Sequence, residues 1–370
     1  MDLMRTFWLS MHVPYACRHS GACCTAGWPV PVERARLAPL RMLRPDRKWL
    51  VLAADAPPEM AGVLANDRDG RCVFYARQQG GWPAGGCEIH HELGHAALPS
   101  ACQHFPRECL IDPRGVFVTL SHYCPTAASL LFSHTGPVTI VEGPPVLPTG
   151  DPEGLDARDV LPPLLRPGLL MDHAAYNAWE THLVKSLTSS DDEPEQVLMA
   201  LDHDARSLCT WRARDGALVD VIGALADRVE PAAPPTLDWT CEHQLFVSAL
   251  ASRATHSWSE YPDHAETNWN QRVAHGWRAH GQVINRFLAA HAFAAWMAYQ
   301  GSGSVSHITR LRLVLAVLRA ECIRCCVHED GELDARLLTH AMRQTDLLLV
   351  HLVDRTSLAA RLCGTTPSIE

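Results

Sequence analysis

The sequence has no apolar run long enough to cross a bilayer and no recognisable export signal. Its two most apolar stretches, residues 287–299 and 311–318, are shorter than the ~20 residues that a membrane-spanning helix needs. The N-terminus has one early arginine, and His12 and Pro14 break its short apolar stretch, which makes it a poor signal peptide. We therefore expect a cytoplasmic protein without a membrane partner.

A basic excess is also missing. The chain has 41 acidic and 32 basic side chains, for a formal net charge of -9. Lysine and arginine must neutralise phosphates on a nucleic-acid surface, so this balance argues against a nucleic-acid partner. The net charge does not exclude a local basic patch on the surface.

Familiar cofactor motifs are scarce as well. The glycines at Gly301 and Gly303 follow no strand, and no G-x-G-x-x-G follows one, which argues against the usual doubly wound fold for a nucleotide or for S-adenosylmethionine. The C-x3-C-x2-C signature of radical enzymes is absent too. A methyl donor would need a different site, between the cysteine-rich part of the chain and the helical half.

Cysteine, by contrast, is concentrated at one end. Of 14 cysteines, eight lie in the first third: Cys17, Cys23, Cys24, Cys72, Cys87, Cys102, Cys109 and Cys124. They fall among glycines and prolines, outside any helical or strand periodicity, so packing explains them less well than chemistry does. In a reducing cytoplasm they would bind metal, whereas in a secreted protein the same set would form disulfides.

The chain is long enough for one large core or two moderate ones. We expect a mainly α protein in which a loop-rich, cysteine-rich metal-binding module (1–135) precedes an all-helical domain (169–370). Recurring prolines make 136–168 an extended connector. One strand is indicated in the module, at 116–121. Helical periodicity predicts helices over 174–187, 195–211, 218–229, 241–254, 270–299, 307–327 and 333–362.

The adjacent pair Cys23 and Cys24 point in different directions in an extended or turning backbone. They could serve two neighbouring sites or bind one polynuclear cluster. Thiolates are soft ligands that suit zinc or iron–sulfur chemistry rather than magnesium or calcium. Eight sulfur atoms would fill two four-coordinate sites.

The order of motifs resembles a known family. The motifs are Cys17-x5-Cys23-Cys24-x2-Gly27-Trp28, Cys72-x-Phe74, Gly86-Cys87-x-Ile89-His90-x-Glu92-Leu93-Gly94, Cys102-x2-Phe105-Pro106-Arg107 and Leu120-Ser121-x2-Cys124-Pro125. Together they are similar to the cysteine-cluster family described as zinc- or iron-chelating proteins, and most similar to its flagellin lysine N-methylase branch. The resemblance covers about a third of the chain, with a weaker likeness over 285–299.

The resemblance implies a cytoplasmic metalloprotein with an iron–sulfur cluster (4Fe–4S) or zinc. It also implies a protein lysine N-methyltransferase that uses S-adenosylmethionine, with a protein substrate such as flagellin. Position by position, the implied metal ligands are Cys17, Cys23, Cys24, Cys72, Cys87, Cys102 and Cys124. Cys109 has no counterpart in the family pattern, so ligation and a free thiol stay open for it. No catalytic residue can be assigned.

Two neighbours of the cysteines have roles that stay open. Arg107 could offset the negative charge of thiolates, or form a salt bridge that holds its loop, and the salt bridge is favoured. His90 could tune a metal centre through a hydrogen bond.

A competing motif is His91-Glu92-Leu-Gly-His95, a literal H-E-x-x-H in which two imidazoles one helical turn apart can bind zinc while the glutamate activates water. The surrounding sequence gives little support, because Gly86 and Pro99 confine the helix and no third ligand is evident. A zinc metallopeptidase is therefore a lesser alternative. The other alternative is a non-catalytic zinc module that binds a protein partner.

The remaining patterns are more typical of packing. Cys322, Cys325 and Cys326 lie on one helical face and are expected to be small buried hydrophobes, as are the isolated Cys209, Cys241 and Cys363. Aromatic side chains recur through 269–299; they could hold a lysine or sulfonium cation, but core packing is the favoured use.

Overall fold

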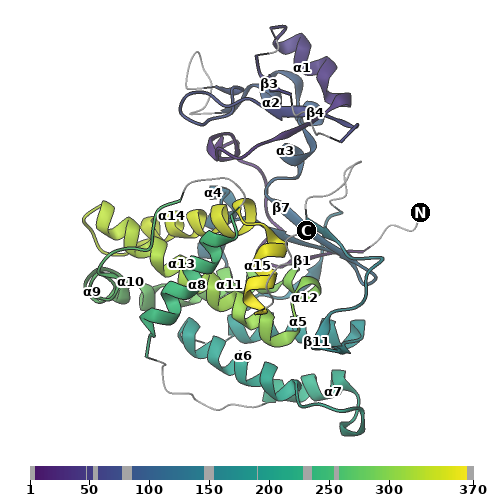
Figure 1. The fold of residues 1–370 in the computed structure, drawn as a ribbon, viewed down its shortest axis with the longest axis vertical. Helices are drawn as coiled ribbons and strands as arrows, with labels where there is room; N and C mark the ends of the chain where they lie inside the picture. The colour runs from purple at the N-terminus through teal and green to yellow at the C-terminus, as the bar shows by residue number, and fades with distance from the viewer. Residues whose placement is uncertain are drawn as a thin grey trace.

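The computed structural model describes residues 5–46, 48–52, 57–76, 86–145, 154–189, 191–227, 236–253 and 258–364. It is 54% helical and 14% strand, which confirms the prediction of a mainly α protein. Within these ranges, no helix combines the length and the apolar character that crossing a membrane requires. Figure 1 shows a small upper part that contains α1–α3 and a larger body in which helices lie beside a sheet.

The small upper part, which we call the thiol module, comprises the described residues between Cys17 and His104. Its strands β2 (Pro31–Glu33), β4 (Met60–Leu64) and β3 (Leu50–Val51) form an antiparallel sheet in that order, and β5 (Tyr75–Ala76) pairs with β6 (Gly86–Cys87). Its helices are η1 (Ala22–Thr25), η2 (Arg34–Arg36), α1 (Leu37–Leu43), α2 (Glu88–Leu93), η3 (His95–Ala97) and α3 (Ser100–His104). Most of these elements are only a few residues long.

The thiol module has a small hydrophobic core of its own. Leu40, Trp49 and Phe74 are fully buried in it. The Trp49 indole donates a hydrogen bond to the Arg44 backbone oxygen at 2.8 Å, and the Arg44 side chain lies 4.9 Å from the centre of the Phe74 ring and pairs with Glu88. These contacts fix α1 against the start of α2. Cys23, Cys24, Cys72, Cys87 and Cys102 complete the same core.

Among the described residues the body contains a five-stranded sheet in the order β10-β7-β8-β1-β9. Its strands are β1 (Thr6–Leu9), β7 (Arg107–Asp112), β8 (Gly115–Leu120), β9 (Ile140–Glu142) and β10 (Gly154–Asp156). β7 and β8 form an antiparallel hairpin, and β1 runs parallel to β8 with Phe7 opposite Phe117. The sheet is more extensive than the single strand expected at 116–121, and the thiol module is inserted between β1 and β7.

Side chains alternate between the two faces of this sheet, as strand geometry requires. Leu110 and Phe117 belong to the large core that the helices fill, whereas Cys109 and Val118 belong to a smaller cluster on the other side. Strand β10 approaches β7 closely, because a Cβ on Gly154 would lie 1.9 Å from the Cys109 backbone oxygen. Glycine is therefore required at that position.

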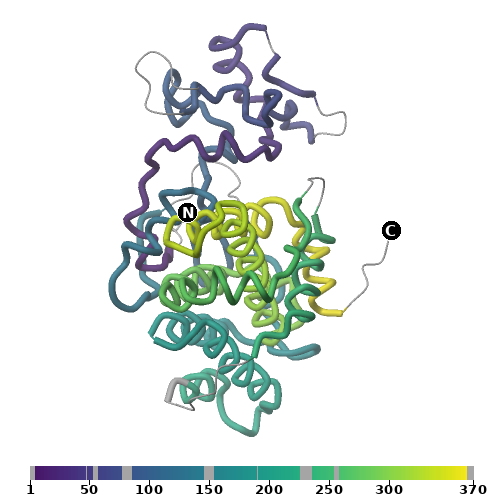
Figure 2. The backbone as a smooth tube through the Cα atoms, turned by 90° about the vertical axis from the view of Figure 1, so that its left-hand side faces the viewer, coloured from purple at the N-terminus to yellow at the C-terminus, as the bar shows by residue number. Residues whose placement is uncertain are grey.

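The helices of the body cover one side of the sheet (Figures 1 and 2). They are α4 (Pro125–Ser133), α5 (His173–Ser189), α6 (Pro194–Leu208), α7 (Leu218–Gly223), α8 (Trp239–Ala251), α9 (Ala265–Asn268), α10 (Ala274–Ala279), α11 (Gly281–Ala292), α12 (Met297–Gln300), α13 (Ser304–His328), α14 (Ala335–Asp346) and α15 (Arg355–Leu362). The short helices η4 (Ala213–Asp215) and η5 (Ala224–Asp227) flank α7. Helix α13 is central, since it contacts α6, α8, α11 and α14.

Two of the expected helices are broken. The stretch 270–299 divides into the π-helix η6 (Trp269–Val273), α10, α11 and α12, and 333–362 divides into α14, the π-helix η7 (Leu347–Leu352) and α15. The break after α11 has a tertiary cause, because the Ala294 backbone N–H donates to the buried Glu180 carboxylate at 2.9 Å and Ala294 has a φ of 54°. The aromatic residues of 269–299 pack in the large core, as expected.

The large core crosses the boundaries drawn from the sequence. It contains Leu9, Phe117 and Leu131 from 1–135 together with residues of the helices. The expected connector 136–168 contributes β9, β10 and β11 (Leu164–Arg166), and β11 pairs with β12 (Leu169–Leu170); residues 146–153 of the connector lie outside the described part. The division into module, connector and helical domain stays a prediction.

Buried polar groups tie the sheet to the helices. The Asp346 carboxylate, at the end of α14, accepts from the His122 backbone N–H and lies 3.1 Å from His122 Nδ1 and 2.8 Å from His291 Nε2. Nearby, Arg114 pairs with Asp112 and Glu180, and its guanidinium lies about 4 Å from the rings of Phe117 and Tyr176. Each buried charge in these two groups therefore has a partner, as buried charges require.

Candidate functional site

The adjacent cysteines lie in a turn of 3-10 helix. Gly21, with a φ of 69°, turns the chain into η1, and the Thr25 hydroxyl donates to the Ala22 oxygen at 3.1 Å to close the turn. This places Cys24 inside the thiol module, where it is 8% exposed, and leaves Cys23 half-buried. The Cys24 backbone oxygen accepts from the Cys72 N–H at 2.8 Å, which joins two segments far apart in the sequence.

Cys87 stands where β6 ends and α2 begins. Its thiol is hydrogen-bonded to Cys24, and the backbone N–H groups of His90 and Ile89 also donate to its sulfur. These hydrogen bonds, that of Cys24 first, lower the pKa of Cys87 to about 7 although burial acts to raise it. Cys87 is therefore close to being a thiolate at neutral pH, the form that binds metal.

Cys24 lies between two sulfur atoms. It hydrogen-bonds to Cys23 as well as to Cys87, and its proton lowers the pKa of Cys23. The pKa of Cys24 itself is raised by the same two hydrogen bonds and by burial. Burial also raises the pKa of Cys72 to about 12, against a hydrogen bond from the Phe74 backbone. Three thiols are thus in direct contact, and a fourth lies within electrostatic range of Cys87 and Cys23.

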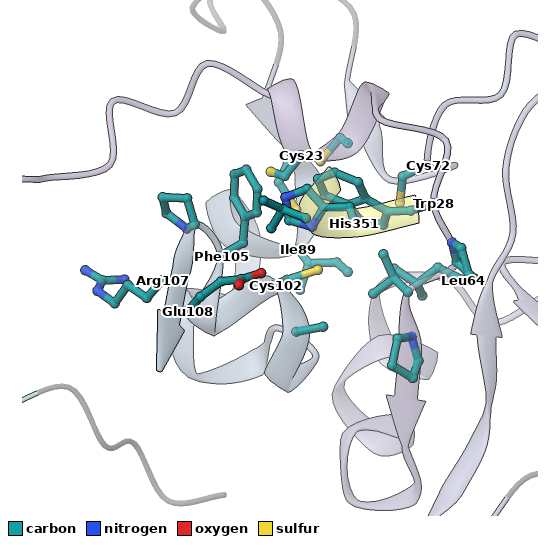
Figure 3. Close-up of a pocket in the computed structure, with 18 of the residues that line it drawn as sticks. Cys23, Trp28, Leu64, Cys72, Ile89, Cys102, Phe105, Arg107, Glu108 and His351 are labelled. Carbon is teal, nitrogen blue, oxygen red and sulfur yellow. The ribbon is translucent and has the colours of Figure 1, made fainter. Parts of the chain in front are cut away.

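These cysteines face a cavity of about 200 Å³ (Figure 3). Cys102 reaches it from α3, which begins where the Ser100 N–H donates to Glu33 at 3.0 Å. The lining comprises Cys23, Cys24, Trp28, Pro29, Val30, Pro31, Leu64, Cys72, Cys87, Ile89, Ala101, Cys102, Phe105, Pro106, Arg107, Glu108, Val350, His351 and Arg355. Five of the seven cysteines named as ligands therefore meet at one cavity, from four separate segments.

The other two, Cys17 and Cys124, lie outside this lining. Cys17 is exposed and accepts a hydrogen bond from the His19 backbone N–H at 3.4 Å, and it interacts electrostatically with both Cys23 and Cys124. Cys124 is buried at the start of α4, 3.7 Å from the Tyr15 hydroxyl. The two cysteines therefore form a second pair that extends from Cys23 toward the body.

Cys109 lies apart from the cavity, in the middle of β7. It is 6% exposed and packs in the small cluster with Trp8 and Val118. Burial, with the nearby Glu108 carboxylate, raises its pKa to about 12. This environment is that of a packed thiol, which is the free-thiol alternative left open by the sequence.

The far wall of the cavity comes from the C-terminal helices, which the sequence motifs did not indicate. Val350 and His351 belong to η7, and Arg355 at the start of α15 pairs with Glu108 at 2.9 Å. The His351 ring centre lies 4.4 Å from that of Trp28, and burial lowers its pKa. No local motif marks these residues, because only the tertiary fold brings them to the cysteines.

Arg107 and His90 differ in their relation to the cavity. Arg107 lies in the lining, with its guanidinium 5.3 Å from the centre of the Tyr15 ring. Its Nε is buried and has no hydrogen-bond partner, and the favoured salt bridge is not found among the described residues. His90 packs against His19, with ring centres 4.6 Å apart, and does not line the cavity.

The H-E-x-x-H motif does not have the geometry that zinc binding by two histidines requires. Helix α2 ends at Leu93, and Gly94 has a φ of 80° and a ψ of 173°, so His95 begins a separate turn. His91 Nδ1 lies 2.9 Å from Glu92. His91 and His95 are therefore not one turn apart on a continuous helix.

Over the described ranges, no group of three or more histidine, cysteine, aspartate or glutamate side chains is arranged so that it could hold a metal ion. The cysteine side chains surround the cavity, and they do not converge on a single position where one ion would lie. Searches against family models, curated proteins and solved structures found no match to the chain.

Proposed function

We propose that this protein binds an iron–sulfur cluster in the cavity between the thiol module and the C-terminal helices. The observation that carries the proposal is the convergence of Cys23, Cys24, Cys72, Cys87 and Cys102 on that cavity. Cys17 and Cys124, which lie outside the cavity lining, complete the proposed ligand set. The cluster would supply electron transfer, and the chain would hold it through thiolates.

The size of the cavity favours a cluster over one zinc ion. Four ligands of a single zinc ion all lie within about 2.3 Å of it, which leaves no room between them. The cavity of about 200 Å³ exceeds by several times the ~30 Å³ that one water molecule occupies in the liquid. In a 4Fe–4S cluster each of four ligands binds a different iron, so ligand atoms spread around a cavity are what it requires, and the cysteines here supply more than four candidates.

The polar and aromatic groups of the cavity suit a charged centre. Arg107 lies in the lining with a buried Nε that has no hydrogen-bond partner in the described part of the chain, so its charge can offset that of thiolates, which is one of the two roles that the sequence left open for it. Trp28 and Phe105 give the cavity an aromatic wall, with ring centres 5.4 Å apart. A metal bound here would stabilise the thiol module directly, since unfolded cysteines offer no preformed site.

Metal analysis tests this proposal. Protein purified without oxygen, as made or reconstituted with iron and sulfide, should contain iron and acid-labile sulfide in similar amounts and absorb visible light. Colourless protein with zinc alone would support the alternative, a non-catalytic zinc module that binds a protein partner. Protein that binds neither metal would refute the proposal.

Lysine methylation is the activity that we propose for this centre, on the basis of the resemblance to flagellin lysine N-methylases. Trp28, Phe105 and the Glu108 carboxylate stand beside the cysteines, and aromatic rings with a carboxylate attract an ammonium or sulfonium cation.

Incubation with S-adenosylmethionine labelled in its methyl group should label lysines of flagellin or another cytoplasmic protein. The metal-loaded Trp28→Ala variant should lose this labelling, and absence of labelling by the metal-loaded wild type would refute the activity alone.

The metallopeptidase alternative has its own test. Glu92→Gln removes the carboxylate that would activate water while leaving every cysteine in place. A peptidase activity that this substitution abolished, with unchanged metal content, would overturn the assignment of the site to the cysteines.

A further inference from the structure

We propose that His351 is a ligand of the metal centre, so that the centre joins cysteines of the thiol module to one imidazole of the C-terminal helices. This inference rests on the proposed function and specifies it further. His351 lines the same cavity as the five cysteines, although more than 200 residues separate it from the last of them in sequence.

The backbone at His351 is irregular. Helix α14 continues directly into the π-helix η7, in which Leu347, Leu348, Leu349 and Leu352 remain buried. A π-turn inserts one residue into the helical repeat, and such turns are frequent at functional sites. It keeps the leucines in the core while His351 lines the cavity.

The hydrogen bond of His351 leaves one ring nitrogen for a ligand. Nε2 lies 2.7 Å from the Ser121 hydroxyl oxygen, and that oxygen also accepts from the Tyr123 backbone N–H at 3.3 Å. Within the described ranges, the hydrogen bond found for the His351 ring is the one at Nε2, and none is found at Nδ1. If Nε2 carries the hydrogen and donates it to Ser121, Nδ1 presents a lone pair and can bind metal without releasing a proton. A hydrogen bond from the second nitrogen is the usual support of a metal-bound histidine.

Aromatic neighbours hold the ring in place. Its centre lies 4.4 Å from that of Trp28, 5.9 Å from that of Phe105 and 6.4 Å from that of Tyr123. Figure 3 shows His351 beside Trp28 among the cysteine side chains. Trp28 follows the Cys23–Cys24 pair in sequence, so the residue next to the thiols also orients the imidazole.

An imidazole ligand has a measurable consequence. It is neutral where a thiolate is negative, and replacement of cysteine by histidine on an iron–sulfur centre raises the reduction potential. The reduced centre should also show the magnetic coupling of a ¹⁴N nucleus bound to iron. A histidine that only packs against Trp28 would give neither signal.

The decisive variant is His351→Phe, which keeps the aromatic packing and removes both nitrogens. We expect wild-type protein loaded with iron and sulfide to show directly bound ¹⁴N in pulsed electron paramagnetic resonance, and His351→Phe to lose it. His351→Cys should bind a cluster of lower reduction potential. The matched control His280→Phe alters a histidine that pairs with Phe132, outside the cavity lining, and should leave the signal unchanged.

Ser121→Ala provides a second test if His351→Phe fails to fold, because it removes the hydrogen bonds of the Ser121 hydroxyl to Nε2 and to the Tyr123 N–H and leaves the imidazole in place. It should change the ¹⁴N coupling and the potential while iron content persists. Wild-type protein that binds iron without a nitrogen signal, or a signal that survives in His351→Phe, would overturn the role of His351 alone. Wild-type protein that binds no iron would overturn the proposed function as well.

Discussion

Cysteines occur in both parts of the molecule, but their surroundings differ. Cys322, Cys325 and Cys326 lie in α13 among leucines and valines of the large core, and burial raises the pKa of Cys325 to about 12 and that of Cys326 to about 11. In the thiol module, Cys23 and Cys87 have lowered pKa values because both share the single S–H hydrogen of Cys24, which lies between them. The same residue type is a packed hydrophobe in one part and a potential thiolate in the other.

The two parts also differ in how they treat buried polar groups. In the body, Arg319 pairs with Glu195 and Glu242 at 2.5 Å each, and Asp346 has two imidazole partners. In the thiol module, the sulfur atoms have mainly one another as partners and a cavity beside them. The charged groups named in the body are paired with one another, whereas the thiols of the module line a cavity.

The largest expected effect separates the two sets of cysteines directly. Cys87→Ala should lower the affinity for iron by more than about tenfold, because it removes a ligand rather than an outer support. Cys322→Ala should retain the iron and cost only about 1 kcal/mol in stability, since it removes one buried sulfur. Iron content per folded chain and urea unfolding measure the two effects. Equal iron content in Cys87→Ala and Cys322→Ala would contradict the proposal that cysteines of the thiol module, and not those of α13, bind metal.

Breaking an ion-pair network of the body should cost stability without affecting metal. Arg319→Met leaves the largely buried Glu195 and Glu242 carboxylates without their shared cation, although Glu195 keeps a hydrogen bond from Trp277, and we expect a loss of about 3 kcal/mol in the free energy of unfolding. The control Arg206→Met breaks the pair with Asp202, in which Arg206 is 63% exposed, and should cost less than about 0.5 kcal/mol. A loss of iron from folded Arg319→Met would show that the two parts are more tightly coupled than this comparison assumes.

Acid should destabilise the body through His307. Burial, with nearby Arg310, lowers the pKa of His307 from 6.5 to about 3 in the folded chain. The unfolded chain therefore takes up a proton between those values that the folded chain does not. Stability contributed by neutral His307 is complete above pH 6.5 and falls by about 2 kcal/mol by pH 5. His307→Leu should lose less stability than wild type between pH 7.5 and pH 5 in urea unfolding. Equal losses would contradict the assignment.

The smallest effect tests a helix start that the sequence indicated. Glu193 accepts from the N–H of Gln196, and the Gln196 side chain accepts from the Glu193 N–H at 3.1 Å, which caps α6. Glu193→Ala should cost about 1 kcal/mol in thermal or urea unfolding. Asp159→Ala, in an exposed turn, should change stability by less than about 0.5 kcal/mol. Similar values for both would show that the cap contributes little.

Local sequence patterns predicted where several helices lie. They did not predict features of the fold that depend on contacts between segments far apart in the sequence. The helical periodicity of 174–187 and 307–327 matches α5 and α13, because a repeating apolar face is a property of the segment itself. The break at Ala294 could not be predicted, since it arises from a contact with Glu180, and no local signal in the sequence marked the π-helix η7. Cys241 was expected to be buried and is exposed, because α8 presents it to solvent.

The candidate site likewise contains some residues that the sequence indicated and others that only the tertiary fold brings to it. The clustering of thiols among glycines and prolines indicated eight cysteines as a group, and it did not separate the five that line the cavity from Cys17, Cys109 and Cys124. Trp28 was visible as part of a motif, but its contact with His351 was not. His351 and Arg355 lie in a regular helical pattern, and only the folding of the C-terminal helices onto the module gives them a place in the site.

The insertion of the thiol module between β1 and β7 has a consequence for biosynthesis. The ribosome completes every proposed cysteine ligand by Cys124, whereas the wall that contains His351 emerges last. At ~5–20 residues per second, roughly 10 to 50 seconds separate the two events. During that interval the C-terminal helices do not yet cover the cysteines. If the cysteines bind the proposed cluster, iron and sulfide can reach them from that side before synthesis ends.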